Sequence, residues 1–360
     1  MAVPLFATSL AALKPRLAEK LAEVLEGGRF ILGPEVEAFE EEFASYLGAR
    51  YAIGVANGTD AITIALRAMG VGPGDEVICP SFTFYATPEA VVNAGATPVF
   101  CDVDPATFCV TAETVERAIS ARTRAVVPVH LFGNVAPVAE LRRFGVPILE
   151  DAAQAIGARR DGESAGALGD AATFSFFPSK NLPCLGDGGA IATDDELVAT
   201  RARRLRFHGS EDKVTHTEVG YNSRLDELQA AVLRTLLPEL DGWNFARRGV
   251  AAAYERHGLG ELVELPRPEP SVEHVYHLFV ARHERAEELV GALGRAGIGA
   301  RGYYRRPCHL QPGMARYGGE RLDLPGTALA ARTHLALPMG PELDDRSVSE
   351  VIAACASGLT

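Results

Sequence analysis

The sequence predicts an α/β protein with a mostly parallel central sheet and a smaller C-terminal α+β region. Short apolar runs alternate with helix-like segments from about residue 50 to residue 200. These runs are apolar almost without interruption, which is typical of strands covered on both faces. The 360 residues exceed one ordinary core and suit two domains of roughly 100–200 residues. We expect a large domain over 1–237 and a smaller one over 238–360.

Seven strands are expected in the large domain, because each run is short, rich in β-branched or aromatic residues and bounded by turn residues. They lie at 51–56, 76–80, 97–103, 125–133, 147–151, 172–177 and 189–194. Amphipathic segments separate most of them, as parallel strands require. The last two runs have no helix between them, which leaves room for one antiparallel strand.

A long helical region at 224–258 follows, with an interruption expected at Pro238. The segment 266–271 is a turn-rich loop. Beyond it the sequence predicts a strand in "VYHLFVAR" and helices in "RAEELVGALGRAGIGA" and "DDRSVSEVIAAC".

Composition excludes several classes of function. The net charge is −12, which argues against non-specific binding to nucleic acid but not against a small phosphorylated ligand. No run approaches the about 20 apolar residues of a membrane helix, and the N-terminus lacks the features of a signal peptide. The six cysteines have no metal-ligand spacing, so we expect a cytoplasmic, reduced protein without a metal site.

The first candidate binding element is the turn Asn57–Asp60, where a strand ends and a helix begins. Backbone N–H groups around Gly58 and the Thr59 hydroxyl lie at the helix N-terminus, which favours an anion. An ordinary helix cap is the alternative interpretation.

Asp151 ends an apolar strand, and ligands of open α/β sheets bind beyond the carboxyl ends of strands. A carboxylate there can pair with a protonated ring nitrogen, as a pyridoxal cofactor requires. Gln154 follows three residues later and can offer an amide to the same ligand. A helix N-cap is the alternative role of Asp151.

The segment "FSFFPSKNLPCLGDGGAI" (174–191) places Lys180 after an apolar strand and before several glycines. A lysine amine that is partly removed from water can form a Schiff base with an aldehyde. Ser175 can reach a phosphate from the strand. Taken alone, a lysine in this position is more often a solvated loop lysine. The phosphate turn, the acidic strand end and the lysine nevertheless occur in the chain order of one known architecture.

Co-linear motifs carry this resemblance along nearly the whole chain: "GGRFILGPEVEAFEEEFASYLGA", "NGTDAI", "PSFTFYAT", "PVHLFG", "EDAAQAIGA", "FSFFPSKNL…GDGGAI", "GYNSRLDELQAA" and "HLQPGM". The chain resembles the DegT/StrS family of pyridoxal-phosphate-dependent sugar aminotransferases, which have the aspartate aminotransferase (type I) fold. The resemblance therefore implies pyridoxal 5′-phosphate as cofactor and residues 1–237 as the cofactor-binding domain.

The resemblance also implies roles for the cofactor end of the site. Lys180 would carry the cofactor as a Schiff base and later move the proton, and Asp151 would pair with the pyridine nitrogen. Phe84 would stack on the ring with Gln154 near it. The phosphate-binding residues would be Gly58, Thr59 and Ser175.

Further residues are implied at the subunit boundary and the substrate end. Asn222 would reach the phosphate from the neighbouring subunit, which implies a homodimer with shared active sites. Arg224, His309 and Phe30 would lie in the nucleotide-sugar pocket. His130 is expected to be a structural histidine. The segment 301–306, "RGYYRR", suits either anion recognition or a solvated loop, and we place it outside the core site.

The expected reaction moves an amino group from glutamate to a nucleotide-linked ketosugar. The motifs look most similar to members that aminate C3 of UDP-linked 2-acetamido-3-keto-hexuronic acids, and Arg224 would then meet the sugar carboxylate. One alternative is a 4-aminotransferase of a UDP- or dTDP-linked 4-keto-6-deoxy sugar. Others are a noncatalytic regulator on the same fold and a phosphate-binding α/β domain without a cofactor.

Overall fold

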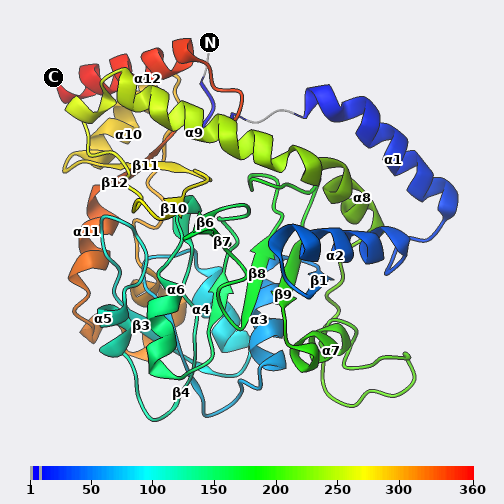
Figure 1. The fold of residues 1–360 in the computed structure, drawn as a ribbon. Coiled ribbons are helices and arrows are strands. Elements are labelled where there is room, and N and C mark those ends of the chain that lie inside the picture. Colours follow the sequence, from blue (N-terminus) through cyan, green and yellow to red (C-terminus); the bar gives the residue numbers. More distant parts are fainter. Residues whose placement is uncertain (1–2, 8–9) are drawn as a thin grey trace.

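The computed structural model describes residues 3–7 and 10–360, apart from the side chain of Glu320 (Figure 1). Its strands are β1 Tyr51–Val55, β2 Glu76–Pro80, β3 Thr97–Cys101, β4 Thr123–Val126, β5 Leu149–Asp151, β6 Arg159–Arg160, β7 Glu163–Ser164, β8 Ala171–Ser175, β9 Gly189–Thr193, β10 Val272–Glu273, β11 Phe279–Arg282 and β12 His334–Leu337. Its α-helices are α1 Lys14–Gly27, α2 Pro34–Leu47, α3 Gly58–Ala68, α4 Ala86–Asn93, α5 Ala112–Glu116, α6 Val138–Leu141, α7 Glu196–Leu205, α8 Glu227–Leu236, α9 Leu240–Arg256, α10 Ala286–Arg295, α11 Pro325–Thr333 and α12 Asp345–Leu359.

The central sheet contains all seven predicted strands. Two ladders, β3-β2-β4 and β5-β8-β9-β1, are joined by parallel bridges from Val126 to Ile148 and from Val129 to Asp151. β9 pairs antiparallel with both β8 and β1, while the pairs β2–β3, β2–β4 and β5–β8 are parallel. The predicted mostly parallel sheet with one antiparallel strand is confirmed.

One predicted strand end in the large domain was wrong by seven residues, whereas the others there lie within two residues of the observed ends. The run 125–133 was expected to be a single strand, but β4 ends at Val126. Pro128 has no N–H to donate to the ladder, and a 3₁₀ turn at Leu131–Gly133 follows with Phe132 at φ 59°. The chain therefore turns away near Asp151, with which Val129 still makes its bridge.

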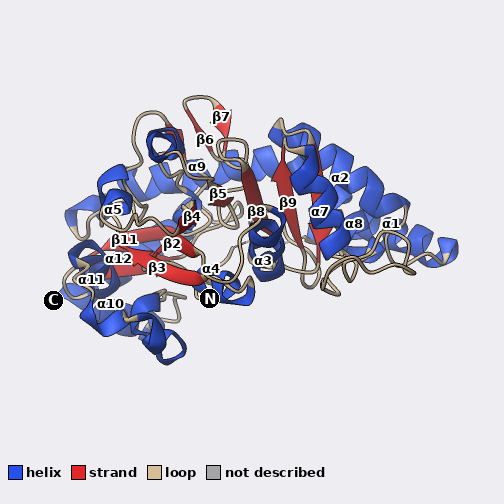
Figure 2. Cartoon of the chain, turned by 90° about the horizontal axis from the view of Figure 1, so that it is seen from below, coloured by secondary structure: helices blue, strands red, loops and turns tan. Residues whose placement is uncertain are grey.

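Helices cover both faces of the sheet (Figure 2). Ile53 and Ile191 pack in one cluster with the apolar stripes of α3, α4 and α7. Their strand neighbours Ala52 and Ala190 face the other side and pack with residues of α2 and α8. Alternate residues of each strand thus enter different cores, which explains the uninterrupted apolar runs.

The C-terminal region has its own core. β11 and β12 form an antiparallel pair, and α9, α10 and α12 pack together beside it (Figure 1). The expected interruption of the long helical region is confirmed, because a 3₁₀ turn at Leu237–Glu239 separates α8 from α9. The sequence interpretation missed β12, whose partner β11 lies more than fifty residues away in the chain.

None of the helices in the described part of the chain is long and apolar enough to cross a bilayer.

Candidate active site

A cavity of about 1320 Å³ lies where four strands of the sheet end. Asp151 and Ser175 are the last residues of β5 and β8, Gly58 begins the helix after β1, and Phe84 lies in the loop after β2. Carboxyl ends of parallel strands meet at one edge of a sheet, so this placement follows from topology. The predicted site residues that line the cavity are Gly58, Thr59, Phe84, Asp151, Gln154, Ser175 and Lys180.

The N-terminus of α3 and the end of β8 lie against each other. The Asn57 side chain caps the helix by accepting a hydrogen bond from the Asp60 N–H at 2.8 Å. A Cβ at Gly58 would lie 2.8 Å from the Ser175 Cβ and 3.3 Å from its Oγ, so only glycine permits this approach. The first N–H groups of the helix and the Ser175 hydroxyl are thereby gathered in one place, which suits a phosphate.

Asp151 is a buried carboxyl whose two oxygens are both bonded. Thr87 donates to Oδ2 at 2.8 Å and the Ala153 N–H donates to Oδ1 at 3.2 Å. Burial raises the pKa of Asp151, although these hydrogen bonds and the charge of Lys180 oppose that rise. Such a carboxyl is suited to sharing a proton with a ligand.

Lys180 is partly buried in the wall of the cavity, and its backbone N–H donates to the Phe177 carbonyl at 2.8 Å. Burial lowers the pKa of Lys180 to about 8, while the negative charge of Asp151 raises it. A substantial fraction of the amine is therefore neutral near pH 8, and a neutral amine is the nucleophile that an aldehyde requires.

Gln154 connects three parts of the chain around the cavity. Its Oε1 accepts from the Phe132 N–H at 2.9 Å, and its Nε2 donates to the Tyr304 hydroxyl at 3.2 Å. The Tyr304 ring stacks on Phe132 at 6.0 Å and lies 6.2 Å from the ring of Phe84. Phe132 and Tyr304 both have positive φ, so packing and these hydrogen bonds hold a strained backbone at the site.

Four predicted site residues do not line this cavity within one chain. Phe30 and Asn222 are exposed, and the Arg224 guanidinium lies 5.9 Å from the Phe207 ring centroid. His309 is buried, and its Nδ1 is hydrogen-bonded to the Ser81 hydroxyl. Its neighbours Cys308 and Gln311 do line the cavity. The roles of these four residues stay predictions.

The sequence interpretation missed several residues of the cavity. Thr87 orients Asp151 and is the last residue of the motif "PSFTFYAT", in which the sequence interpretation assigned only Phe84 to the site. His277 lines the cavity, and its buried Nδ1 has no hydrogen-bond partner among the described residues. Tyr304 belongs to the segment "RGYYRR", which was expected outside the core site but whose six residues all lie in the cavity wall. The three arginines of this segment were the only feature of the sequence that could have indicated a binding site there.

His130 has the structural role expected of it. It is fully buried, accepts from the Ala136 N–H at Nδ1 and contacts the Glu150 carboxylate through Nε2 at 2.7 Å. Glu150 also accepts from three backbone N–H groups, those of Gly166, Leu168 and Gly169. This network fixes the loop between β7 and β8, and its residues do not line the cavity.

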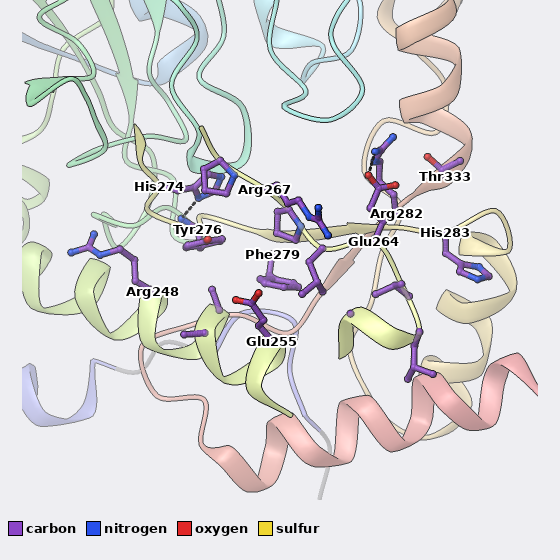
Figure 3. A pocket seen from close by; sticks show the side chains of 18 of the residues that line it. Arg248, Glu255, Glu264, Arg267, His274, Tyr276, Phe279, Arg282, His283 and Thr333 are labelled. Carbon is purple, nitrogen blue, oxygen red and sulfur yellow. Dashed lines mark hydrogen bonds and ion pairs between the residues drawn. The ribbon is translucent and has the colours of Figure 1, made fainter. Parts of the chain in front are cut away.

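A second cavity of about 1150 Å³ lies between α9 and β11 (Figure 3). Several of its polar side chains have partners within the protein. His274 accepts from the Tyr276 N–H at 2.9 Å, and Arg282 pairs with Glu264. Its described lining contains no lysine and no buried carboxyl comparable to Asp151, so it offers no equivalent chemistry.

The model of the DegT/DnrJ/EryC1/StrS aminotransferase family matches residues 12–356. The dTDP-3-amino-3,4,6-trideoxy-alpha-D-glucose transaminase of Streptomyces venezuelae is 47% identical, over 93% of this chain and 89% of its own. A pleiotropic regulatory protein of Geobacillus stearothermophilus is 46% identical, over 94% and 93%. The UDP-2-acetamido-2-deoxy-3-oxo-D-glucuronate aminotransferase of Pseudomonas aeruginosa is 40% identical, over 96% of both chains.

Solved structures agree over nearly the full length. DesV of S. venezuelae, in complex with a ketimine intermediate, superposes with a TM-score of 0.95 at 45% identity and covers 98% of this chain and 97% of its own. NtdA of Bacillus subtilis, with bound cofactor PMP, has a TM-score of 0.89 at 33% identity, over 99% and 85%. The predicted type I fold is confirmed.

The relatives do not single out uronic acids, because the glucuronate enzyme is less similar than the dTDP-sugar enzyme. The predicted family is nevertheless the right one. The chain belongs to the DegT/DnrJ/EryC1/StrS aminotransferase family, and its catalytic class is that of a sugar aminotransferase.

Proposed function

We propose that this protein uses pyridoxal 5′-phosphate to transfer the amino group of glutamate to C3 of a nucleotide-linked 3-keto sugar. The observation that carries the proposal is the combination in one cavity of Lys180, whose pKa is lowered to about 8, and the buried carboxyl of Asp151. Family membership supports the same reaction class.

The residues present fit the cofactor. The glycine at position 58 leaves space beside Ser175 that a Cβ would fill, and the donors there suit a phosphate. Asp151 is held by Thr87 in an orientation that leaves its carboxyl in the cavity wall. When bound, the cofactor withdraws electrons from the carbon that carries the transferred nitrogen.

Each residue then has a defined task. Gly58, Thr59 and Ser175 would bind the phosphate, and Phe84 would cover one face of the ring. Asp151 would hold a proton on the ring nitrogen. Lys180 would attach the cofactor and, once displaced by the amino donor, accept and return a proton as a general base and acid.

Amination at C3 is favoured by what relatives act on. Enzymes named for dTDP-3-amino sugars, for UDP-N-acetyl-3-dehydro-glucosamine and for 3-oxo-glucose-6-phosphate are 47%, 41% and 37% identical to this chain. The last of these is named for glutamate as well. No relative named above is a 4-aminotransferase, so C4 is the second choice. Among the 3-keto sugars, a hexuronic acid remains a candidate that Arg224 would recognise through its carboxylate.

The proposal includes a homodimer with shared active sites. Asn222 and Arg224 lie outside the cavity of their own chain, and Phe30, Ile31 and Phe177 are large apolar side chains exposed on the isolated chain. We propose that the second subunit covers these side chains. Asn222 would then act at the phosphate of the second subunit.

A mixing experiment tests the shared site. Lys180→Ala chains should be inactive alone, and Asn222→Ala chains should bind the cofactor weakly. At limiting pyridoxal phosphate, activity should rise when the two are unfolded and refolded together, because one site of each hybrid dimer is intact. If the hybrid dimers have no activity although each parent protein is folded and dimeric, the proposal that the two subunits share their active sites is contradicted.

A noncatalytic regulator is the rival function, because one relative is named as a regulatory protein. The retained Lys180 and Asp151 argue against it, since a regulator needs neither the nucleophile nor the proton partner. The test is turnover of glutamate with dTDP- and UDP-linked 3- and 4-keto sugars, including a 3-keto-hexuronic acid. We expect turnover of a 3-keto sugar and none by Lys180→Ala. A wild-type protein that binds no pyridoxal phosphate would overturn the enzymatic proposal.

A further inference from the structure

The cavity wall formed by residues 301–311 brings two free guanidinium groups to the substrate side of the site. Arg301, Arg305 and Arg306 all line the cavity. Within the described residues, none of the three forms an ion pair with a carboxylate, although the protein carries 47 acidic residues against 35 basic ones. Arg301 and Arg306 are exposed to solvent, so both guanidinium groups are available to an anion that enters the cavity.

Arg305 has a structural explanation. Its Nη1 donates to the carbonyls of Ala331 and Arg332, at 3.3 and 2.8 Å, in the last turn of α11. A cation at the C-terminus of a helix stabilises that helix. These bonds give Arg305 a role in the fold, although its buried Nη2 has no hydrogen-bond partner among the described residues. Arg301 and Arg306 have no such contact with the end of an α-helix in the described part of the chain.

Arg301 and Arg306 are held but not neutralised. The Arg301 guanidinium lies 5.2 Å from the centroid of the Tyr303 ring. The Arg306 Nε donates to the Leu310 carbonyl at 2.7 Å, which leaves both Nη groups for another acceptor. The cavity also contains the carboxylates of Asp60, Glu89 and Asp187, but none of them pairs with either arginine.

The segment that carries these arginines is anchored on both sides. Tyr304 accepts a hydrogen bond from Gln154, and the Cys308 N–H donates to the Ser81 carbonyl at 2.9 Å. The His309 N–H donates to the Ser81 hydroxyl at 3.3 Å. Side chains presented from a rigid segment lose little freedom when they bind a ligand.

The volume of the cavity leaves room for more than the cofactor. At about 1320 Å³ it exceeds the roughly 300–1,000 Å³ of common small-ligand pockets. We propose that Arg301 and Arg306 form the subsite that binds the phosphate groups of the nucleotide-linked sugar, an inference that rests on the proposed function. Guanidinium groups match phosphate oxygens in geometry and charge.

Direct binding tests the subsite without any turnover. The holoenzyme is titrated with dTDP, UDP and inorganic pyrophosphate by calorimetry, for wild type, Arg301→Gln, Arg306→Gln and Arg316→Gln. Arg316 is the matched control, because it also lies over a neighbouring tyrosine, 4.8 Å from the Tyr317 centroid, but outside the cavity. We expect each cavity variant to weaken binding by about tenfold and the control to bind like wild type.

Arg301 and Arg306 could instead bind the carboxylate of the amino donor, glutamate. The half-reaction with glutamate and the half-reaction with the keto sugar are therefore measured separately. Conversion of the cofactor by glutamate should stay within about twofold of wild type in Arg301→Gln and Arg306→Gln, whereas KM for the nucleotide sugar should rise about tenfold. Equal loss in the glutamate half-reaction would overturn the proposal, as would wild-type protein that binds none of the three phosphate probes. If binding is lost as expected but no keto sugar turns over, the proposed function fails and the anion subsite stands.

Discussion

The Gly58→Ala substitution probes the close contact between α3 and β8. The added Cβ would lie 2.8 Å from the Ser175 Cβ, whereas unstrained carbon atoms approach to about 3.5 Å. The helix N-terminus and the strand end must therefore separate by about half an ångström or more. Overpacking of this kind costs about 1–3 kcal/mol, and replacing a helical glycine with alanine returns at most about 1 kcal/mol.

We therefore expect a modest loss of stability in the cofactor-free protein and a larger loss of pyridoxal phosphate affinity. Displacing even one charge-assisted hydrogen bond to the phosphate costs about 1.5–3 kcal/mol, so Kd should rise about tenfold or more. Kd is measured by fluorescence titration, and stability by thermal unfolding with and without the cofactor.

Gly249→Ala is the matched control, because Gly249 lies exposed in α9 and a methyl group added there would have no neighbouring atom within 4 Å. It should raise stability by about 0.5–1 kcal/mol and leave cofactor affinity unchanged. If Gly58→Ala binds the cofactor as tightly as wild type, the phosphate does not lie between α3 and Ser175.

Three further predictions concern charge and buried polar groups. Covalent attachment of pyridoxal phosphate to cofactor-free protein should speed up as pH rises through about 8, because the pKa of Lys180 is lowered to that value and only the neutral amine reacts. If the attachment rate instead has its pH midpoint near the ordinary pKa of lysine, this prediction is refuted. Asp151→Asn removes the charge that raises the pKa of Lys180, so the pH midpoint of the attachment rate should move to lower pH while turnover falls. An unchanged pH midpoint would show that the two groups do not interact. Glu150→Gln places an amide against the backbone N–H donors of Gly166, Leu168 and Gly169 and should lower the free energy of unfolding by about 3 kcal/mol. The control Glu26→Gln, on the exposed side of α1, should change it by less than about 0.5 kcal/mol. Equal effects of the two substitutions in urea unfolding would contradict the buried network.

The meeting of the residues proposed to bind the cofactor could be predicted from sequence, for a topological reason. Gly58, Asp151 and Ser175 each lie at the carboxyl end of a strand or directly after one, and such ends share one edge of a sheet. Short-range patterns located the strands, so the residues at their ends could be expected to meet.

The substrate side could not be predicted in the same way. Tyr304 reaches Gln154 across 150 residues, and β12 pairs with β11 across more than fifty, because both contacts depend on how the C-terminal region packs. His277 carries no local motif at all. The roles proposed for Asn222 and Arg224 depend on a second chain, which no single-chain pattern places.

Transfer of isotopic nitrogen tests the central proposal most directly. The holoenzyme is incubated with α-¹⁵N-glutamate and a dTDP- or UDP-linked 3-keto sugar, and the product is examined by NMR. We predict ¹⁵N bonded to C3 of the sugar with wild-type protein and none with Lys180→Ala. A wild-type protein loaded with pyridoxal phosphate that transfers no ¹⁵N to any keto sugar of the panel, or transfers it to C4 only, would contradict the proposal.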